Sequence, residues 1–249
     1  MIQRDRIRLT YQLEFESPFH CGTGFSKGLT DRAIHRDKDD YLYIPGSTIK
    51  GVLRENCELA ARILGIAVRD PHDEENAAKA FFENPDIVER IFGSRYQESS
   101  IFFDNAWMRE KDKKFFDSSS REDKRYRFLQ TENRTQTRLS RKTGTVMEGA
   151  LYTSEFGISQ LKFEGKIHGW LEGTSNELSD DLSGSYPLYL LVTGIYMAQR
   201  IGASRSTGTG RCRFDIQELQ VNENVENSKH YCEKMEDFIC YDDAREEAI

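Results

Sequence analysis

The strictest pattern in the sequence is the alternation of apolar and polar residues from residue 6 to residue 16. Every second position is apolar, and these positions are Ile7, Leu9, Tyr11, Leu13 and Phe15. Successive side chains of a β-strand point to opposite faces, so the pattern predicts a strand with one buried and one exposed face. Residues 161 to 171 alternate in the same way and predict a second strand of this kind.

Two helices and two further strands are predicted around these segments. Ile49, Val52, Leu53 and Cys57 follow one another at helical spacing, and residues 186 to 201 are the most apolar stretch of the chain, which is typical of a buried helix. Residues 101 to 107 and the segment from residue 212 read as strands. The order is strand, helix, strand, long insertion, strand, helix, strand. It predicts an α+β, ferredoxin-like (RRM-like) sandwich with its helices on one face of an antiparallel sheet.

Composition limits the class of protein. A chain of 249 residues fits one large domain, and no apolar run approaches the roughly 20 residues that span a membrane. The N-terminus lacks the apolar segment of an export signal. The five cysteines are odd in number and form no C-x-x-C pair, which argues against a disulfide framework and fits a reduced cytoplasm.

Charge is divided unevenly along the chain, whose formal net charge is -7. Residues 222 to 249 carry nine acids and three bases, and we expect an acidic tail there that is dispensable for RNA binding, with the domain at residues 1 to 221. Residues 109 to 142 carry twelve bases and six acids, interleaved with aromatics and without a period. An insertion of this kind, at about residues 109 to 152, is expected to bind nucleic acid and to be mobile until it does. A solvated loop is the alternative.

Residues 31 to 54 combine an aspartate-rich loop with the start of the first helix. Ser47 is expected to cap this helix, because its hydroxyl can accept a hydrogen bond from a free backbone amide. Lys50 and Arg54 lie four residues apart and therefore share a face. Free amides and two aligned cations make a candidate site for a phosphate chain. An ordinary capped helix with a solvated basic face is the alternative.

A glycine-rich loop, residues 202 to 210, separates the apolar helix from the last strand. Gly202, Gly208 and Gly210 allow positive φ angles and close backbone approach, and Arg205 and Arg211 flank the loop. The loop matches neither a P-loop nor the dinucleotide fingerprint.

Five segments, taken in order, resemble the RAMP proteins of type III CRISPR effector complexes, most closely the backbone subunit that repeats along the guide RNA. They are His20-Cys21-Gly22, residues 31 to 37, the helix motif at residues 44 to 54, residues 137 to 152, which resemble the base of a thumb hairpin, and the glycine-rich loop at residues 202 to 211. The resemblance covers roughly residues 1 to 220.

The resemblance implies a RAMP fold with a long thumb insertion and a metal-dependent endoribonuclease. Such subunits form a filament on guide RNA with further RAMP subunits and other effector subunits, and the thumb wedges into the duplex of guide and target RNA. Asp31 occupies the position of the cleaving aspartate and would hold a divalent cation, Mg or Mn, while Asp37 is a second candidate. The implied RNA-binding residues are Ser47, Thr48, Lys50, Arg54, Arg138, Arg141, Lys142, Arg205 and Arg211.

Three other functions remain open. The chain could be a structural RAMP subunit with a silent loop, because Arg32-Ala33 stands where many members have a small residue and a proline. A stand-alone endoribonuclease that processes guide precursors would use histidine, for which His20 and His35 are suitably placed. An RRM-like single-strand binder would need aromatic residues on the sheet face in an RNP pattern, which the sequence does not show.

Overall fold

A computed structural model of the chain describes residues 3–28, 30–70, 73, 84–117, 126–173 and 185–233. Its main sheet is antiparallel, in the order β2-β4-β7-β1-β8-β9, with β3 also paired to β7. The strands are β1 (Gln3–Phe15), β2 (Tyr43–Ile44), β3 (Ile101–Phe103), β4 (Ala106–Met108), β7 (Lys162–Gly173), β8 (Cys212–Val221) and β9 (Asn224–Glu226). The helices are α1 (Gly46–Ile63), α3 (Ile87–Phe92), α4 (Glu110–Asp117), α5 (Tyr186–Met197) and α6 (Ser228–Glu233), with 3-10 turns η1 (Arg127–Gln130) and η2 (Arg205–Thr207).

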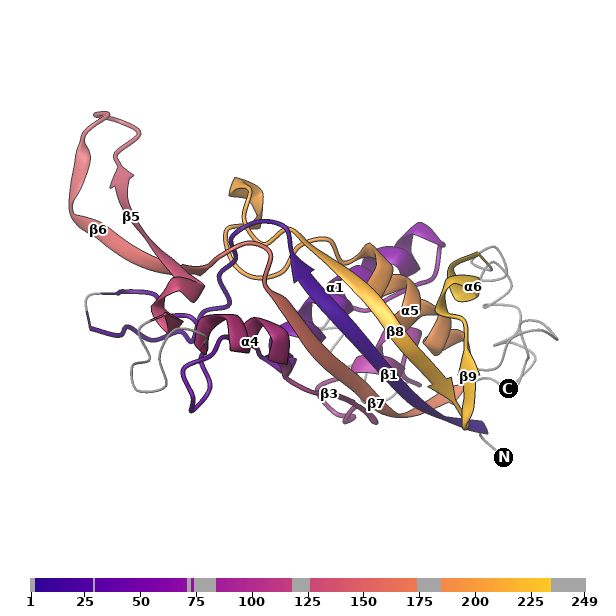
Figure 1. The fold of residues 1–249 in the computed structure, drawn as a ribbon. Helices are drawn as coiled ribbons and strands as arrows, with labels where there is room; N and C mark the ends of the chain where they lie inside the picture. The colour runs from indigo at the N-terminus through magenta and orange to yellow at the C-terminus, as the bar shows by residue number, and fades with distance from the viewer. Residues whose placement is uncertain are drawn as a thin grey trace.

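The predicted α+β fold is confirmed. The two alternating segments form the central strands β1 and β7, which pair in antiparallel register from Gln3↔Gly173 to Glu14↔Lys162. Helices α1 and α5 lie behind these strands in Figure 1 and leave the other sheet face open toward the viewer. No described helix is both long and apolar enough to cross a lipid bilayer.

The core lies between the sheet and the two long helices. All five alternating apolar residues of β1, from Ile7 to Phe15, are at most 1% exposed. They meet the apolar face of α1, where Ile49, Leu53 and Cys57 are each 0% exposed, and the nearly wholly buried α5. The removal of the apolar faces of the sheet and of the two helices from water is the main stabilising contribution here.

The insertion contains regular structure. Two strands, β5 (Thr131–Leu139) and β6 (Val146–Gly157), form a hairpin that projects from the body at the upper left of Figure 1. Residues 109 to 142 lack a sequence period, but α4 and β5 form there. Most side chains of β5 are exposed, because a projecting two-stranded ribbon has solvent on both faces. Without a buried face there is no alternation of apolar and polar residues to detect.

The predicted boundary at residue 221 falls between two paired strands. β9 pairs with β8 in antiparallel register, and α6 follows it directly. Tyr231 of α6 is 0% exposed and lies with its ring centroid 4.7 Å from that of Tyr189 in α5. The folded unit thus extends at least to Glu233, and an acidic tail outside it begins no earlier than residue 234.

Candidate nucleic-acid interface

Asp31 lies beside the lower half of the hairpin, where it is held by the backbone of β6. Its own N–H donates to the carbonyl oxygen of Thr153 at 2.9 Å, and the Thr153 N–H donates to Asp31 Oδ2 at 2.7 Å. The side chain is exposed, and Oδ1 has no hydrogen-bond or ion-pair partner among the described residues. One carboxylate oxygen is therefore fixed by the hairpin, and the other remains available to a ligand.

Glu155 ties the rest of the loop to the same strand. Its Oε1 accepts from the Arg36 guanidinium at 2.6 Å, and its Oε2 accepts from the Ile34 N–H at 3.1 Å. Burial acts to raise the pKa of Glu155, but the hydrogen bonds from Arg36 and Ile34 outweigh it and leave the pKa below its usual value. Local sequence patterns do not predict this contact, because Ile34 and Glu155 are 121 residues apart and Glu155 lies outside the five motif segments.

We expect the ordering of the loop by Glu155 to depend on pH. The pKa of Glu155 is lower in the folded state than in the unfolded state, where it is near 4.5. The ionised carboxylate therefore stabilises the folded loop fully at pH values above 4.5, and this contribution is lost as the pH falls through the folded-state pKa. Glu155→Gln should remove the pH dependence and weaken the loop by roughly 1.5–3 kcal/mol, the range for hydrogen bonds to charged groups. Hydrogen exchange of the Ile34 amide, compared with its intrinsic rate at each pH, measures this. Equal protection in both proteins at pH 7 would contradict it.

The second candidate, Asp37, has a structural role in the turn that follows. Its Oδ1 accepts from the N–H groups of Asp39 and Tyr41, both at 2.9 Å. This carboxylate closes the turn that places Asp40 at a φ of 68°. Asp31 is thus the better placed of the two for chemistry on a ligand.

The two histidines suited to a processing nuclease lie in different environments. His20 is 6% exposed, and its Nδ1 lies 2.6 Å from the carbonyl oxygen of Glu155. His35 is half-buried beside the Tyr43 hydroxyl, at 3.3 Å, and burial lowers its pKa. His20 therefore supports the base of the hairpin, and His35 is favoured in its neutral form.

The start of α1 differs from the prediction. The helix begins at Gly46 with Pro45 as its N-cap residue, and Pro45 makes no side-chain hydrogen bond to the helix, so Ser47 is not the cap. A side chain at position 46 would collide with the carbonyl oxygen of Phe103, and the Gly46 N–H instead donates to the Asn105 side chain at 2.9 Å. Because Pro45 O accepts from the amides of Thr48 and Ile49, the array of free amides is smaller than expected.

The two predicted cations on α1, Lys50 and Arg54, have different roles in the structure. Arg54 Nε donates to Glu58 at 2.9 Å, and Arg54 NH1 donates to the carbonyl oxygen of Gly93 at 3.1 Å, so this side chain joins α1 to the end of α3. Lys50 instead lines a hollow of about 440 Å³ together with Gly46 and Ser47. Burial and the charge of Arg54 lower the pKa of Lys50, whose ammonium group has no compensating ion pair among the described residues.

Single substitutions should separate these two roles. Lys50→Ala is expected to weaken RNA binding and to reduce the salt slope by about 0.7, the value for one phosphate contact on a single strand. Arg54→Ala should mainly lower the stability of the fold, because it leaves a helix-end carbonyl and Glu58 without this partner. Salt-dependent binding and urea unfolding measure the two effects. A larger change of salt slope in Arg54→Ala than in Lys50→Ala would reverse the assignment.

Three predicted RNA-binding cations, Arg138, Arg141 and Lys142, lie at the free end of the hairpin. Their side chains are exposed and form no ion pair with the described residues. The turn of the hairpin, residues 140 to 145, falls between the two halves of the segment predicted to be the base of the thumb. That segment, residues 137 to 152, is the outer half of the hairpin, and the base is instead at Thr131 and Gly157.

The glycine-rich loop takes up the conformation expected of it. Gly202, Gly208 and Gly210 all have positive φ, and a side chain at Gly210 would collide with the carbonyl oxygen of Ile201. Arg205 forms a two-pronged contact with Glu55 of α1, at 2.7 and 3.3 Å, and Arg211 pairs with Glu16 at 2.8 Å. These pairs are exposed and contribute little to stability, so phosphates can replace the carboxylates at low cost.

The donor set fits a metal that is shared with RNA. The described residues contain no cluster of three histidine, cysteine, aspartate or glutamate side chains that could hold an ion. Magnesium is often bound through one or two carboxylates together with substrate phosphates and water. Asp31 can supply one such carboxylate oxygen, and the remaining ligands would have to come from RNA and water.

Comparison with known proteins agrees with this architecture. A chain in the cryo-EM structure of the type III-B Cmr-beta bound to cognate target RNA superposes with a TM-score of 0.54 at 12% identity, covering 84% of this chain and 96% of that one. No curated protein sequence matches the chain. The family model of the RAMP superfamily matches residues 12–213, from the middle of β1 into β8. The chain therefore belongs to the RAMP superfamily.

Proposed function

We propose that this protein is a guide-RNA-binding subunit of a type III CRISPR effector complex that cleaves target RNA, with Asp31 as its catalytic residue. The observation that carries the proposal is the position of Asp31, fixed by a backbone amide of a projecting, cation-tipped hairpin. The structural neighbour bound to cognate target RNA supports an RNA-facing role for this fold. Guide RNA, target RNA, further RAMP subunits and other effector subunits are the proposed partners.

The hairpin and the loop have complementary roles in this proposal. Cations at the free end of the hairpin and Lys50 hold phosphates, so the hairpin can enter a duplex and splay a target nucleotide. Splaying lets the 2′-hydroxyl line up with the scissile phosphorus, the geometry that RNA cleavage requires. Asp31 then lies next to the displaced backbone with one free oxygen. A divalent cation, when bound, would stabilise the negative charge that develops on the phosphoryl oxygens.

Sequencing the RNA that copurifies with the expressed complex tests the proposal. A guide-binding subunit should retain RNA of fixed length with a constant 5′ segment. RNA of random sequence would contradict guide binding, and cleavage of guide precursors by the isolated chain would favour the processing nuclease. A silent structural subunit would retain the guide, but its complex would leave target RNA intact.

A further inference from the structure

The open face of the sheet carries exposed aromatic rings at the end remote from the hairpin. Phe102 of β3 is 59% exposed and Trp170 of β7 is 48% exposed. His168, also exposed, stacks on Phe102 with the ring centroids 5.6 Å apart and the planes inclined by 27°. Aromatic side chains on a solvent-facing sheet are costly to leave uncovered, and they mark a surface that takes a partner.

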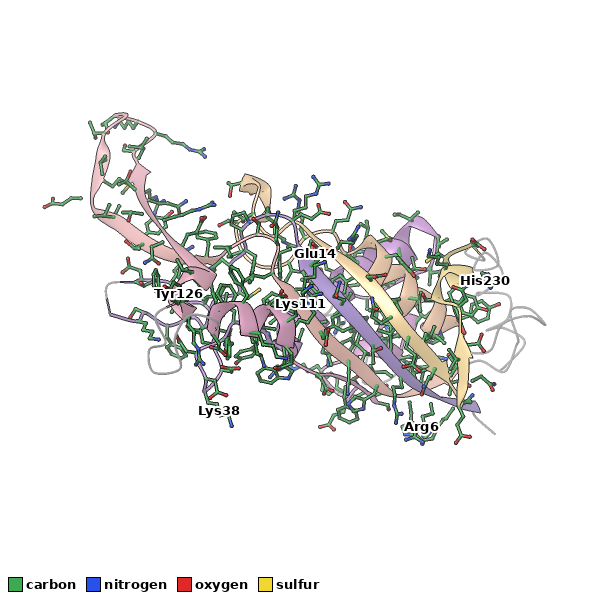
Figure 2. All side chains as sticks on the ribbon, viewed as in Figure 1. Arg6, Glu14, Lys38, Lys111, Tyr126 and His230 are labelled. Atoms are coloured by element: carbon green, nitrogen blue, oxygen red, sulfur yellow. The ribbon has the colours of Figure 1, made fainter. Side chains whose placement is uncertain are left out.

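Two arginines of β1 stand beside these rings. Arg6 pairs in register with Trp170, and Arg8 pairs with His168, which in turn pairs with Phe102. Both guanidinium groups are exposed, and neither forms a hydrogen bond or ion pair with the described residues. Arg6 is labelled at the lower right of Figure 2, at the opposite end of β1 from Glu14 and the hairpin.

The two arginines face a row of residues without an acid. In the cross-strand row through Arg8, the neighbours on β7, β3 and β8 are His168, Phe102 and Gln220. Two carboxylates border this row: Asp104 lies 3.5 Å from His168, and Glu218 accepts from the Gln220 side chain at 2.6 Å. Flat rings next to unpaired guanidinium groups are the combination that binds single strands, through base stacking and phosphate contacts.

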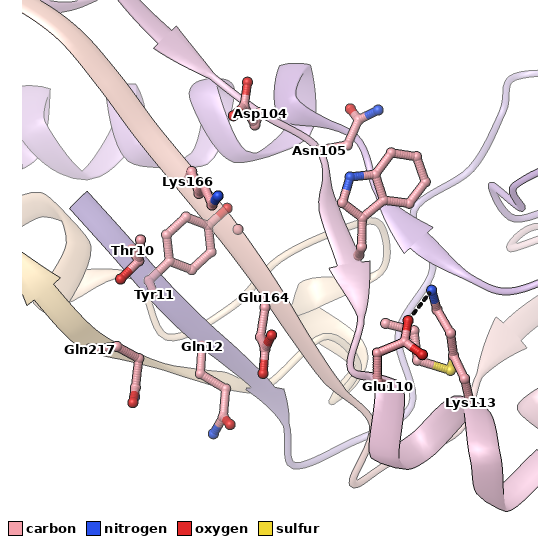
Figure 3. A pocket seen from close by; sticks show the side chains of 13 residues that line it. Thr10, Tyr11, Gln12, Asp104, Asn105, Glu110, Lys113, Glu164, Lys166 and Gln217 are labelled. Atoms are coloured by element: carbon pink, nitrogen blue, oxygen red, sulfur yellow. Dashed lines mark hydrogen bonds and ion pairs between the residues drawn. The ribbon is translucent and has the colours of Figure 1, made fainter. Parts of the chain in front are cut away.

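A pocket of about 840 Å³ continues this surface toward the middle of the sheet. It opens where residues 104 and 105 separate β3 from β4. Figure 3 shows the amides of Gln12, Asn105 and Gln217 around it, together with two lysines, Lys113 and Lys166, and three carboxylates, Asp104, Glu110 and Glu164. The Tyr11 hydroxyl lines the pocket but is buried without a hydrogen-bond partner among the described residues. Amides and a hydroxyl can donate to and accept from the edge of a base.

We propose that the open sheet face is a second RNA surface, which binds a single strand with bases stacked on Phe102, His168 and Trp170 and phosphates held by Arg6 and Arg8. The next base of the strand enters the pocket toward the Tyr11 hydroxyl. The surface is separate from Asp31 and the hairpin and does not depend on the function proposed for them, and its Phe102 also borders the hollow that Lys50 lines. Its aromatic residues come from β3 and β7, which is why no RNP pattern reveals them in the sequence.

The two tryptophans of the chain allow a direct test. Trp107→Phe keeps an aromatic ring beside Tyr43 and leaves Trp170 as the sole tryptophan. The full-length chain with this substitution is titrated with a single-stranded oligoribonucleotide of roughly eight nucleotides. Trp170 fluorescence should be quenched on binding. Phe102→Ala should weaken binding about tenfold, within the range measured for loss of one stacking ring. Arg6→Ala with Arg8→Ala should reduce the salt slope by about 1.4, two phosphate contacts at 0.7 each.

A matched variant tests whether the effect is specific to these two arginines. Arg213→Ala removes an arginine from the same sheet, ion-paired to Glu14 at 3.3 Å, and should leave quenching unchanged. The proposal is overturned if the oligonucleotide binds without quenching Trp170, or if the Arg6 and Arg8 variant binds like the parent. If Trp170 fluorescence is quenched by raising the protein concentration and not by adding RNA, the surface is a protein interface, and the proposal is overturned as well.

Discussion

Replacing Asp31 by asparagine should reduce target-RNA cleavage by at least about 100-fold, the scale for losing one group that stabilises charge in a transition state. The amide oxygen of asparagine can still accept from the Thr153 N–H, so the loop keeps its anchor and only the negative charge is lost. RNA binding and thermal unfolding should therefore remain at parental values. The measurement is single-turnover cleavage of a target strand by the assembled complex in magnesium or manganese.

Two further variants test whether the loss of cleavage is specific to the charge of Asp31. Asp39→Asn makes the same carboxylate-to-amide change in an exposed turn residue, and this variant should cleave at the parental rate. Asp31→Ala loses both the charge and the acceptor for Thr153, so it should add a loosened loop to the loss of cleavage. Cleavage by Asp31→Asn at the parental rate would assign the chemistry to other residues and leave this chain a scaffold.

Truncation after Val221 should unfold or severely destabilise the domain. It removes β9, which covers the edge of β8, and Tyr231, which is 0% exposed against Tyr189. Loss of one buried aromatic side chain costs about 3–5 kcal/mol, a large part of the 5–15 kcal/mol typical of a whole domain. Urea unfolding of the truncated chain should show a much lower midpoint than that of the full chain.

A second truncation, after Glu233, provides the control. It keeps β9 and α6 and removes only the acid-rich segment at residues 234 to 249, so its unfolding midpoint should match that of the full chain. Equal midpoints for the chains ending at 221 and at 233 would show that α6 contributes nothing to the fold. RNA affinity is meaningful only for the longer of the two, because a destabilised domain loses affinity for unrelated reasons.

The sheet and its two long helices were predictable because each buries one face. Alternation in β1 and β7 and the apolar run of α5 report burial directly, so the order of elements follows from the sequence. The hairpin was implied by the family resemblance and not by any hydrophobic pattern, because β5 buries neither of its faces. Nucleic-acid binding by this segment, inferred from its local charge, stays a prediction.

The candidate site was predictable in its residue types but not in its contacts. Arg54 has the spacing of a phosphate ligand, but the structure places it against Glu58 and the end of α3, a neighbour that helical spacing does not reveal. Ser47 was expected to cap α1, but Asn105 supplies the acceptor from a distant loop. Glu155 organises the Asp31 loop through contacts that cross more than a hundred residues. Such contacts depend on tertiary packing, which local patterns do not encode.

The hydrogen bond that positions Asp31 comes from a main-chain N–H, not from a side chain. Every residue except proline carries that donor, so position 153 can change its chemical identity and still hold the carboxylate. The part that position 153 plays in the site therefore does not require any particular side chain there. Proline is the one coded substitution that would expose the dependence, because it deletes the donor while Asp31 itself is unchanged.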